Sequence, residues 1–489
     1  MGKPDTAVIA ATAGGSAGRP PRARLWPACV GEATGRRLRR LLLGALVIRV
    51  LLLPLFTHLD LLTEYWVAHI RAFDGRFPFE VMGGIFPFSL THYWHVASLW
   101  LVSPLLPDPH ELFRHPWGEA DSPGMTTLED WRFFLGHPAA MRAVALFKLP
   151  YIGLDLLGAA LLTRLADTEE DAYALARFWL LNPVCVFVLY VFSRYEVVSV
   201  LAVLAALLAI KRGRQLSGMV WLGLGAILKM YPFLLAPCAV LGLQSRLRGR
   251  VRLGLALLVP GILLLASATV TGNRSELGSF SKFRHNDYLF ELRLPTADPP
   301  SAAASVGVAG TQGAVGTIGV PHIPADVLLF PLALFLVWLR LAGRTLGRQA
   351  QPEADFELFL GYGLAVFLLL FATCFFHPHY AMWAVPFWAV MRLHHRRLRV
   401  LWAMHLPLLV VHSFHWGAPL WSQLAAVIDP ISFWSSRAPV DVLGDGAAAF
   451  ILSVNRALLS GICVFAAWCA LRIAEGDGKA QRGELAGAG

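Results

Sequence analysis

Long runs of apolar residues recur along this chain of 489 residues and limit what it can fold into more than any single motif does. A helix needs about 20 predominantly apolar residues to cross a bilayer. Hydrophobic residues make up 56% of the sequence and charged residues only 15%, which excludes a soluble or a disordered chain. We therefore expect an all-α, polytopic membrane protein, with apolar runs near 41–57, 143–163, 174–192, 195–210, 216–230, 231–244, 252–271, 325–342, 356–375, 379–391, 399–416 and 448–472.

Basic residues form five short clusters between these runs. The clusters are residues 36–40, 211–214, 246–252, 340–348 and 392–399. Cytoplasmic loops carry the excess of Lys and Arg in membrane proteins, so we expect all five clusters inside, and the net charge of +10 then needs no nucleic-acid partner. An even number of crossings must separate neighbouring clusters. The segment 86–107 is therefore predicted to lie in the outer leaflet, which leaves about twelve spans with both termini inside.

This topology divides the chain into three parts. Residues 1–40 are predicted to be a disordered, basic cytoplasmic N-terminus, 41–472 the transmembrane domain, and 473–489 a cytoplasmic tail. Most cysteines lie inside apolar runs, where a thiol acts as a small hydrophobe, and no residue spacing indicates a metal site or another cofactor. Three long segments fall on the outer side, where we expect the chemistry: 58–142, 272–324 and 417–447.

Asp60 and Glu64 lie near the start of the first outer segment. Because they are four residues apart, a helix would place both carboxylates on one face. Two carboxylates just outside a span could act as general base and substrate holder. Asp60 also follows Thr57 by three residues, which suits a helix cap equally well, so both interpretations stay open. The other face is predicted to meet lipid, as in an interfacial amphipathic helix, through Leu61, Leu62, Tyr65 and Trp66.

Four short motifs follow one another in an order that resembles the GT-C glycosyltransferases. They are Gly75-Arg76-Phe77-Pro78-Phe79 after the acidic helix, Leu181-Asn182-Pro183 with Ser193-Arg194-Tyr195-Glu196, Lys229-Met230-Tyr231-Pro232, and His377-Pro378-His379-Tyr380-Ala381-Met382-Trp383. The branch they resemble contains the first GPI mannosyltransferase and bacterial polyprenyl-phosphate-mannose-dependent mannosyltransferases. The chain lacks the Asp-x-Asp form of many relatives, so the resemblance leaves the base open between Asp60 and Glu64.

The resemblance implies transfer of a hexose, with mannose favoured, from a polyprenyl- or dolichyl-phosphate sugar to a hydroxyl on a lipid- or glycan-linked acceptor. The reaction would occur on the outer or luminal face of a bacterial plasma membrane or the endoplasmic reticulum and would invert the anomeric centre. Asp60 or Glu64 would take the hydroxyl proton. A small membrane subunit is a further expected partner. The donor and its phosphate would be bound by Arg194, Glu196, Lys229, Tyr231, Arg284, His377 and Tyr380.

Each of these assignments has a structural alternative. Arg194 could extend from a helix end to the interface, and Asp155 could pair with another helix. A carboxylate such as Glu196 inside an apolar run favours function, because such groups are rare in membranes. A transporter or flippase of a lipid-linked or small polar substrate is the main rival to an enzyme, and a non-catalytic scaffold is the next.

Overall fold

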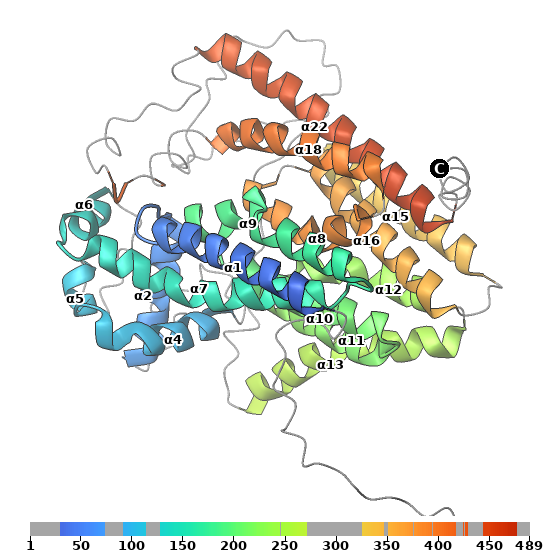
Figure 1. The fold of residues 1–489 in the computed structure, drawn as a ribbon, viewed down its shortest axis with the longest axis horizontal. Coiled ribbons are helices and arrows are strands. Elements are labelled where there is room, and N and C mark those ends of the chain that lie inside the picture. Colours follow the sequence, from blue (N-terminus) through green and yellow to red (C-terminus); the bar gives the residue numbers. More distant parts are fainter. Residues whose placement is uncertain are drawn as a thin grey trace, which may run out of the picture.

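The structure, a computed structural model, is helical throughout its described residues and has no strand among them (Figure 1). The described residues are 30–73, 91–113, 128–244, 246–270, 325–346, 351–374, 376–393, 395–416, 424, 426–428 and 444–476. The predicted all-α class is therefore confirmed for this part of the chain.

The first half of the chain holds the elements around which the site is built. They are α1 (Glu32–Leu52), α2 (Leu59–Phe73), α4 (Thr91–Val102), η1 (Ser103–Leu105), α5 (Pro109–Leu112), α6 (Leu128–Gly136), α7 (Ala140–Thr163), α8 (Glu169–Leu180), α9 (Pro183–Val186), η2 (Phe187–Val191), α10 (Glu196–Lys211), α11 (Gln215–Leu228), η3 (Tyr231–Leu235), α12 (Ala236–Leu243) and α13 (Leu247–Val270).

The second half packs over them. It comprises α15 (Ala325–Thr345), α16 (Pro352–Thr373), η5 (Pro378–Ala384), α17 (Val385–Met391), α18 (Arg396–His412), η6 (Ser413–Trp416) and α22 (Asp445–Ala474). Helices α16 and α22 lie against each other, and α18 packs on α22 (Figure 1).

Four of the described helices are long and apolar enough to cross a membrane, and a fifth span results if the bent pair of α8 with α9 and η2 is counted as one. The protein is thus a multi-pass integral membrane protein, but the twelve predicted spans are not confirmed. Several apolar runs form shorter helices, such as α10 with 16 residues and α11 with 14. At about 1.5 Å per residue these are shorter than a hydrocarbon core of about 30 Å.

Helix α10 lies at the centre of the bundle, and most of its Val, Leu and Ala side chains are buried (Figure 1). Its neighbours α7 and α11 pack along it, and α13 packs on α11 so closely that a Cβ added to Gly223 would lie 2.1 Å from the carbonyl oxygen of Leu257. Glycine is therefore required where these two backbones meet.

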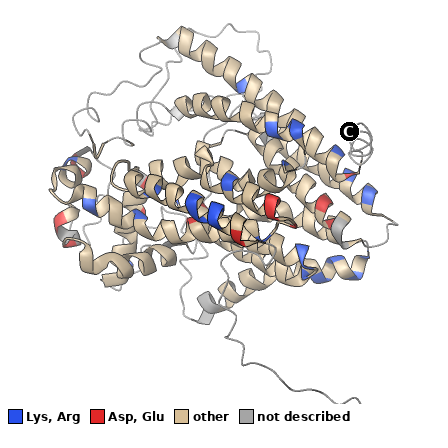
Figure 2. Ribbon diagram, in the orientation of Figure 1, with Lys and Arg blue, Asp and Glu red and all other residues tan. Residues whose placement is uncertain are grey.

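Residues from three of the predicted basic clusters lie at one end of the bundle. The side chain of Arg250 donates to Thr345 at 3.0 Å, and Arg340 and Arg344 both contact Glu475. Lys211, at the C-terminus of α10, binds Asp167 beyond the end of α7. Figure 2 shows Lys and Arg of α13 and α15 near the side where the C-terminus is marked. That this side is cytoplasmic stays a prediction.

A buried ion pair joins α1 to α7. Arg49 donates to Asp155, and both side chains are fully buried. The indole of Trp179 donates to the other carboxylate oxygen at 2.7 Å, and the hydroxyl of Tyr190 donates to the first at 3.0 Å. The prediction that Asp155 pairs with another helix is confirmed.

Candidate functional site

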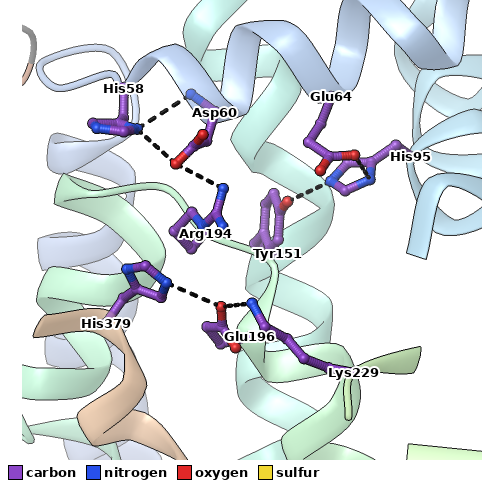
Figure 3. Close-up of polar contacts among 9 residues, drawn as sticks. All are labelled: His58, Asp60, Glu64, His95, Tyr151, Arg194, Glu196, Lys229 and His379. Atoms are coloured by element: carbon purple, nitrogen blue, oxygen red, sulfur yellow. Dashed lines mark hydrogen bonds and ion pairs between the residues drawn. The ribbon is translucent and has the colours of Figure 1, made fainter. Parts of the chain in front are cut away.

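Helix α2 places Asp60 and Glu64 one turn apart, with Asp60 next to Arg194 and Glu64 next to His95 (Figure 3). The prediction that its apolar face meets lipid is wrong, because Leu61, Leu62, Tyr65 and Trp66 are all buried inside the protein. Helix α4 packs along α2 and covers that face. Protein side chains, rather than lipid, therefore fix the orientation of the two carboxylates.

Arg194 reaches Asp60 from the turn that precedes α10. Asn182 caps α9 by accepting the backbone N–H of Val184 at 2.9 Å, and Pro183 suits the first position of that short helix. The chain then reverses at Ser193, whose φ of 62° is the left-handed conformation that non-glycine residues rarely adopt. Nη1 of Arg194 lies 2.7 Å from Oδ2 of Asp60.

Lys148 of α7 holds the two segments that carry this pair. Its buried ammonium donates to the carbonyls of Leu52 and Phe56, at 3.1 and 2.6 Å, where α1 leads into α2. It also donates to the carbonyl of Tyr190 at 3.0 Å, just before Ser193. Three backbone acceptors satisfy an ammonium that has no carboxylate contact within the described part of the chain.

His58, which precedes α2, contacts Asp60 from the other side. Its Nδ1 lies 3.1 Å from Oδ2 of Asp60 and 3.2 Å from the backbone nitrogen of the same residue (Figure 3). The ring stacks on Phe192, which in turn stacks on His379. The Asp60 carboxylate thus contacts the side chains of His58 and Arg194 and also lies in the first turn of α2, so both interpretations of this residue remain predictions.

A second ion pair lies beside the first. Glu196, at the start of α10 and fully buried, pairs with Lys229 at the end of α11. Its other oxygen accepts the indole N–H of Trp383 at 2.7 Å, and Nε2 of His379 is 3.5 Å away. Glu196 is therefore enclosed by Lys229, Trp383 and His379.

Aromatic rings surround the Lys229 ammonium. The ring centroids of Tyr195, Tyr380 and Trp383 lie 4.9, 5.4 and 5.9 Å from Nζ. Trp383 is stacked between Tyr380 and Tyr231, with centroid distances of 4.1 and 4.3 Å. Burial lowers the pKa of Lys229, and the charge of Glu196 opposes that change.

Glu64 faces a different pair of residues. Its Oε2 lies 3.6 Å from Nδ1 of His95 on α4, and Nε2 of His95 lies 2.8 Å from the hydroxyl of Tyr151 on α7 (Figure 3). The sequence motifs did not identify His95 or Tyr151 as site residues. The only local signal was the mixture of His, Tyr and Trp in the segment 86–107.

The two carboxylates differ in their affinity for protons. Burial alone would raise the pKa of Asp60, but the charge of Arg194, with a smaller contribution from His58, holds that pKa well below its ordinary value. Burial raises the pKa of Glu64 to about 7, and Asp60 adds to the rise while Arg194 and Lys229 oppose it. At neutral pH Asp60 is ionised, and Glu64 is divided between its two forms.

The site remains partly open to solvent. The Asp60 side chain is 37% exposed, and those of Glu64, Arg194 and Lys229 are 14–17% exposed. Burial, helped by Arg194, lowers the pKa of His377 to about 3, so this imidazole is neutral at pH 7.

The structure gathers nearly all of the residues predicted for the site. Ion pairs, ring contacts and charge interactions link the following residues into a single cluster: Asp60, Glu64, Arg194, Glu196, Lys229, Tyr231, His377 and Tyr380. Arg284 lies outside the described residues. The described residues contain no group of three or more His, Cys, Asp or Glu side chains that could hold a metal ion. The roles of the gathered residues stay predictions.

Comparison with known proteins adds one finding. Residues 127–301, little more than a third of the chain, match the model of a family described as GPI transamidase subunit PIG-U. No curated protein and no solved structure matches the chain. The segment is thus similar to a membrane protein family of the GPI-anchor machinery, and the glycosyltransferase resemblance is not confirmed.

The matched segment covers only part of the site. It includes Arg194, Glu196 and Lys229, whereas Asp60 and Glu64 on α2 lie outside it. The likeness to PIG-U therefore concerns the cationic side of the cluster. The paired carboxylates, which a transfer reaction would need, come from a part of the chain that the family model does not reach.

Proposed function

We propose that the protein is a membrane glycosyltransferase that moves a hexose, with mannose favoured, from a polyprenyl- or dolichyl-phosphate sugar to a hydroxyl of a lipid- or glycan-linked acceptor. The observation that carries this proposal is the pair of carboxylates on α2 whose pKa values are displaced in opposite directions beside two cations. Such a divergence is typical of groups that divide proton transfer and charge stabilisation between them.

The cluster offers a proton acceptor and two cations for this reaction. The acceptor oxygen attacks the anomeric carbon while the bond from that carbon to the phosphate oxygen breaks, which inverts the anomeric centre. The electron pair leaves with the polyprenyl phosphate, whose charge Arg194 and Lys229 would stabilise. The hydroxyl proton passes to one of the two α2 carboxylates. The polyprenyl tail would stay in the bilayer while its phosphate reaches the partly exposed site.

The match to PIG-U supports a second candidate. The protein would then be a non-catalytic subunit of a transamidase-type assembly, in which Arg194 and Lys229 hold the phosphate of a lipid-linked glycan without transferring a sugar. A transporter is not favoured, because the described polar cluster lies at one end of α10 and not along it.

The test is to incubate purified protein with labelled polyprenyl- or dolichyl-phosphate mannose and a glycolipid acceptor and to measure label transfer. Asp60→Asn should reduce transfer by about 100-fold, because Arg194 loses the partner that positions it. Asp167→Asn makes the same chemical change in the exposed pair with Lys211 and should leave transfer intact. Binding of glycolipid by the wild-type protein with no transfer would favour the subunit function instead.

A further inference from the structure

Glu64, His95 and Tyr151 form a continuous chain across three helices. The chain runs from the partly exposed carboxylate on α2, through the fully buried imidazole on α4, to the fully buried phenol on α7 (Figure 3). None of the four sequence motifs includes His95 or Tyr151, and His95 lies outside the segment that matches a known family.

The direction of the hydrogen bond between His95 and Tyr151 decides which tautomer His95 adopts. When the Tyr151 hydroxyl donates to Nε2, at 2.8 Å, the neutral imidazole carries its proton on Nδ1. That nitrogen faces Oε2 of Glu64 at 3.6 Å. In that tautomer His95 presents an N–H group toward the Glu64 carboxylate, at an ion-pair distance that is longer than a hydrogen bond.

We propose that Glu64, not Asp60, receives the proton of the incoming hydroxyl, and that His95, with its tautomer fixed by Tyr151, is the positioning residue that holds Glu64 in place. This inference rests on the proposed sugar transfer. The hydroxyl O–H bond breaks as the new glycosidic bond forms, the proton joins a Glu64 oxygen, and the electron pair of the broken phosphate bond leaves with the polyprenyl phosphate. Solvent then takes the proton from Glu64, whose side chain is 17% exposed.

The surroundings of the two carboxylates support this division. Asp60 is bound by Arg194 and His58, and its depressed pKa makes it a weak proton acceptor. The pKa of Glu64, about 7, suits a general base at neutral pH. The charged and titratable groups that face Glu64 are Asp60, Arg194, Tyr195, Lys229, His95 and Tyr151.

The pH dependence of kcat tests the identity of the base. A base must be ionised to act, so with Glu64 in this role kcat falls about tenfold per pH unit below pH 7 and levels off above it. Asp60 as the base would give a rate that stays constant from about pH 5 to pH 8, because its carboxylate is ionised throughout. That flat profile would overturn the inference and leave the proposed transfer standing.

Two variants of matched size test His95. His95→Asn can place its amide N–H near the position of Nδ1 and should keep kcat within about threefold, whereas His95→Gln places it near Nε2 and should lower kcat about 100-fold with little change in KM. The Gln variant should also shift the pH profile upward, because the carboxylate loses a donor. Equal behaviour of the two variants would contradict a positioning role.

A matched pair of tyrosines tests the origin of the tautomer. Tyr151→Phe removes the hydroxyl that contacts His95 and should shift the profile in the same direction as His95→Gln, by a smaller amount. Tyr65→Phe removes a buried hydroxyl that donates to the backbone carbonyl of Phe147 and should leave the profile in place. Equal shifts in both variants would indicate a general packing effect and would overturn the role of Tyr151.

A spectroscopic titration separates this inference from the proposed function. Infrared difference spectra of the intact protein should show one carboxyl group that titrates near pH 7, that is absent in Glu64→Gln and that titrates at higher pH in His95→Gln. This measurement needs no transfer activity. A protein that shows the titration but transfers no sugar would contradict the proposed function only, and a protein without the titration would contradict the arrangement of Glu64 and His95.

Discussion

Two arginine–aspartate pairs in this protein use the same chemistry in different settings. Arg49 and Asp155 meet between α1 and α7 with both side chains fully buried, and Trp179 and Tyr190 supply further hydrogen bonds. Arg194 and Asp60 meet at the end of the bundle, where their side chains are 14% and 37% exposed. The first pair is enclosed by protein donors. The second pair lies near Glu64, whose pKa is raised to about 7, and near the Lys229 side chain.

The difference separates a structural pair from a candidate functional one. A buried pair whose partners come entirely from the protein fixes the register of two helices and has no face for a ligand. A partly exposed pair is held less tightly by its surroundings and can exchange protein contacts for contacts with a phosphate. Replacing a residue of the buried pair should therefore lower the free energy of unfolding, whereas replacing a residue of the exposed pair should lower the rate of sugar transfer.

The largest effect on stability is expected when the buried pair is broken. Arg49→Leu leaves Asp155 charged and buried, which should lower the free energy of unfolding by about 3–5 kcal/mol. The double replacement Arg49→Leu with Asp155→Leu should be less destabilising than the single one, because no unpaired charge remains. Thermal unfolding of the detergent-solubilised protein measures both. An unfolding temperature for Arg49→Leu equal to the wild type would show that the two pairs do not differ in this way.

An intermediate effect, on activity and not on stability, is expected at the exposed site. Arg194→Gln should lower sugar transfer by about 100- to 1000-fold while shifting unfolding by less than about 1 kcal/mol. Arg194→Lys keeps the positive charge but loses the planar guanidinium, so its transfer rate should lie between those of the wild type and Arg194→Gln. Rates per folded molecule and unfolding curves of the same preparations check this. A large loss of stability with normal transfer would assign this pair to the structural class.

The smallest effect is expected at a third ion pair. Lys211 and Asp167 join the opposite end of the bundle, with side chains 25% and 79% exposed. Lys211→Met should change the free energy of unfolding by about 0.2–1 kcal/mol and leave transfer unaffected. Screening by added salt should remove most of the difference in unfolding between variant and wild type. A loss of unfolding free energy as large as that of Arg49→Leu would show that solvent exposure does not determine how much these ion pairs stabilise the protein.

Local pattern was enough to predict part of the site. The spacing of Asp60 and Glu64 predicted a shared helix face, and the structure places them one turn apart on α2. The unusual positions of Glu196 and Lys229, a carboxylate in an apolar run and a cation at a helix end, indicated functional side chains, and these two residues do pair. These inferences depend only on neighbours in the sequence and on the cost of isolated charge in an apolar segment.

Other features were outside the reach of the sequence. An amphipathic pattern does not distinguish a face that meets lipid from one that meets protein, so the burial of α2 under α4 was not predicted. His95 and Tyr151 are 56 residues apart, and only the packing of α4 against α7 brings them together. A break such as the turn at Pro183 divides one apolar run into two helices that meet at an angle. The number of apolar runs in the sequence therefore does not give the number of spans.

Residue types alone indicate that the chain belongs in a membrane and that charges such as Arg194 and Lys229 near helix ends are unusual, because burial of apolar side chains and the cost of isolated charge depend on residue type. The difference between the two carboxylates depends on the packing of the helices: Arg194 holds the pKa of Asp60 well below its ordinary value, while burial raises the pKa of Glu64 to about 7. A pKa depends on solvation and on charges a few ångströms away, and here those charges come from helices far apart in the chain.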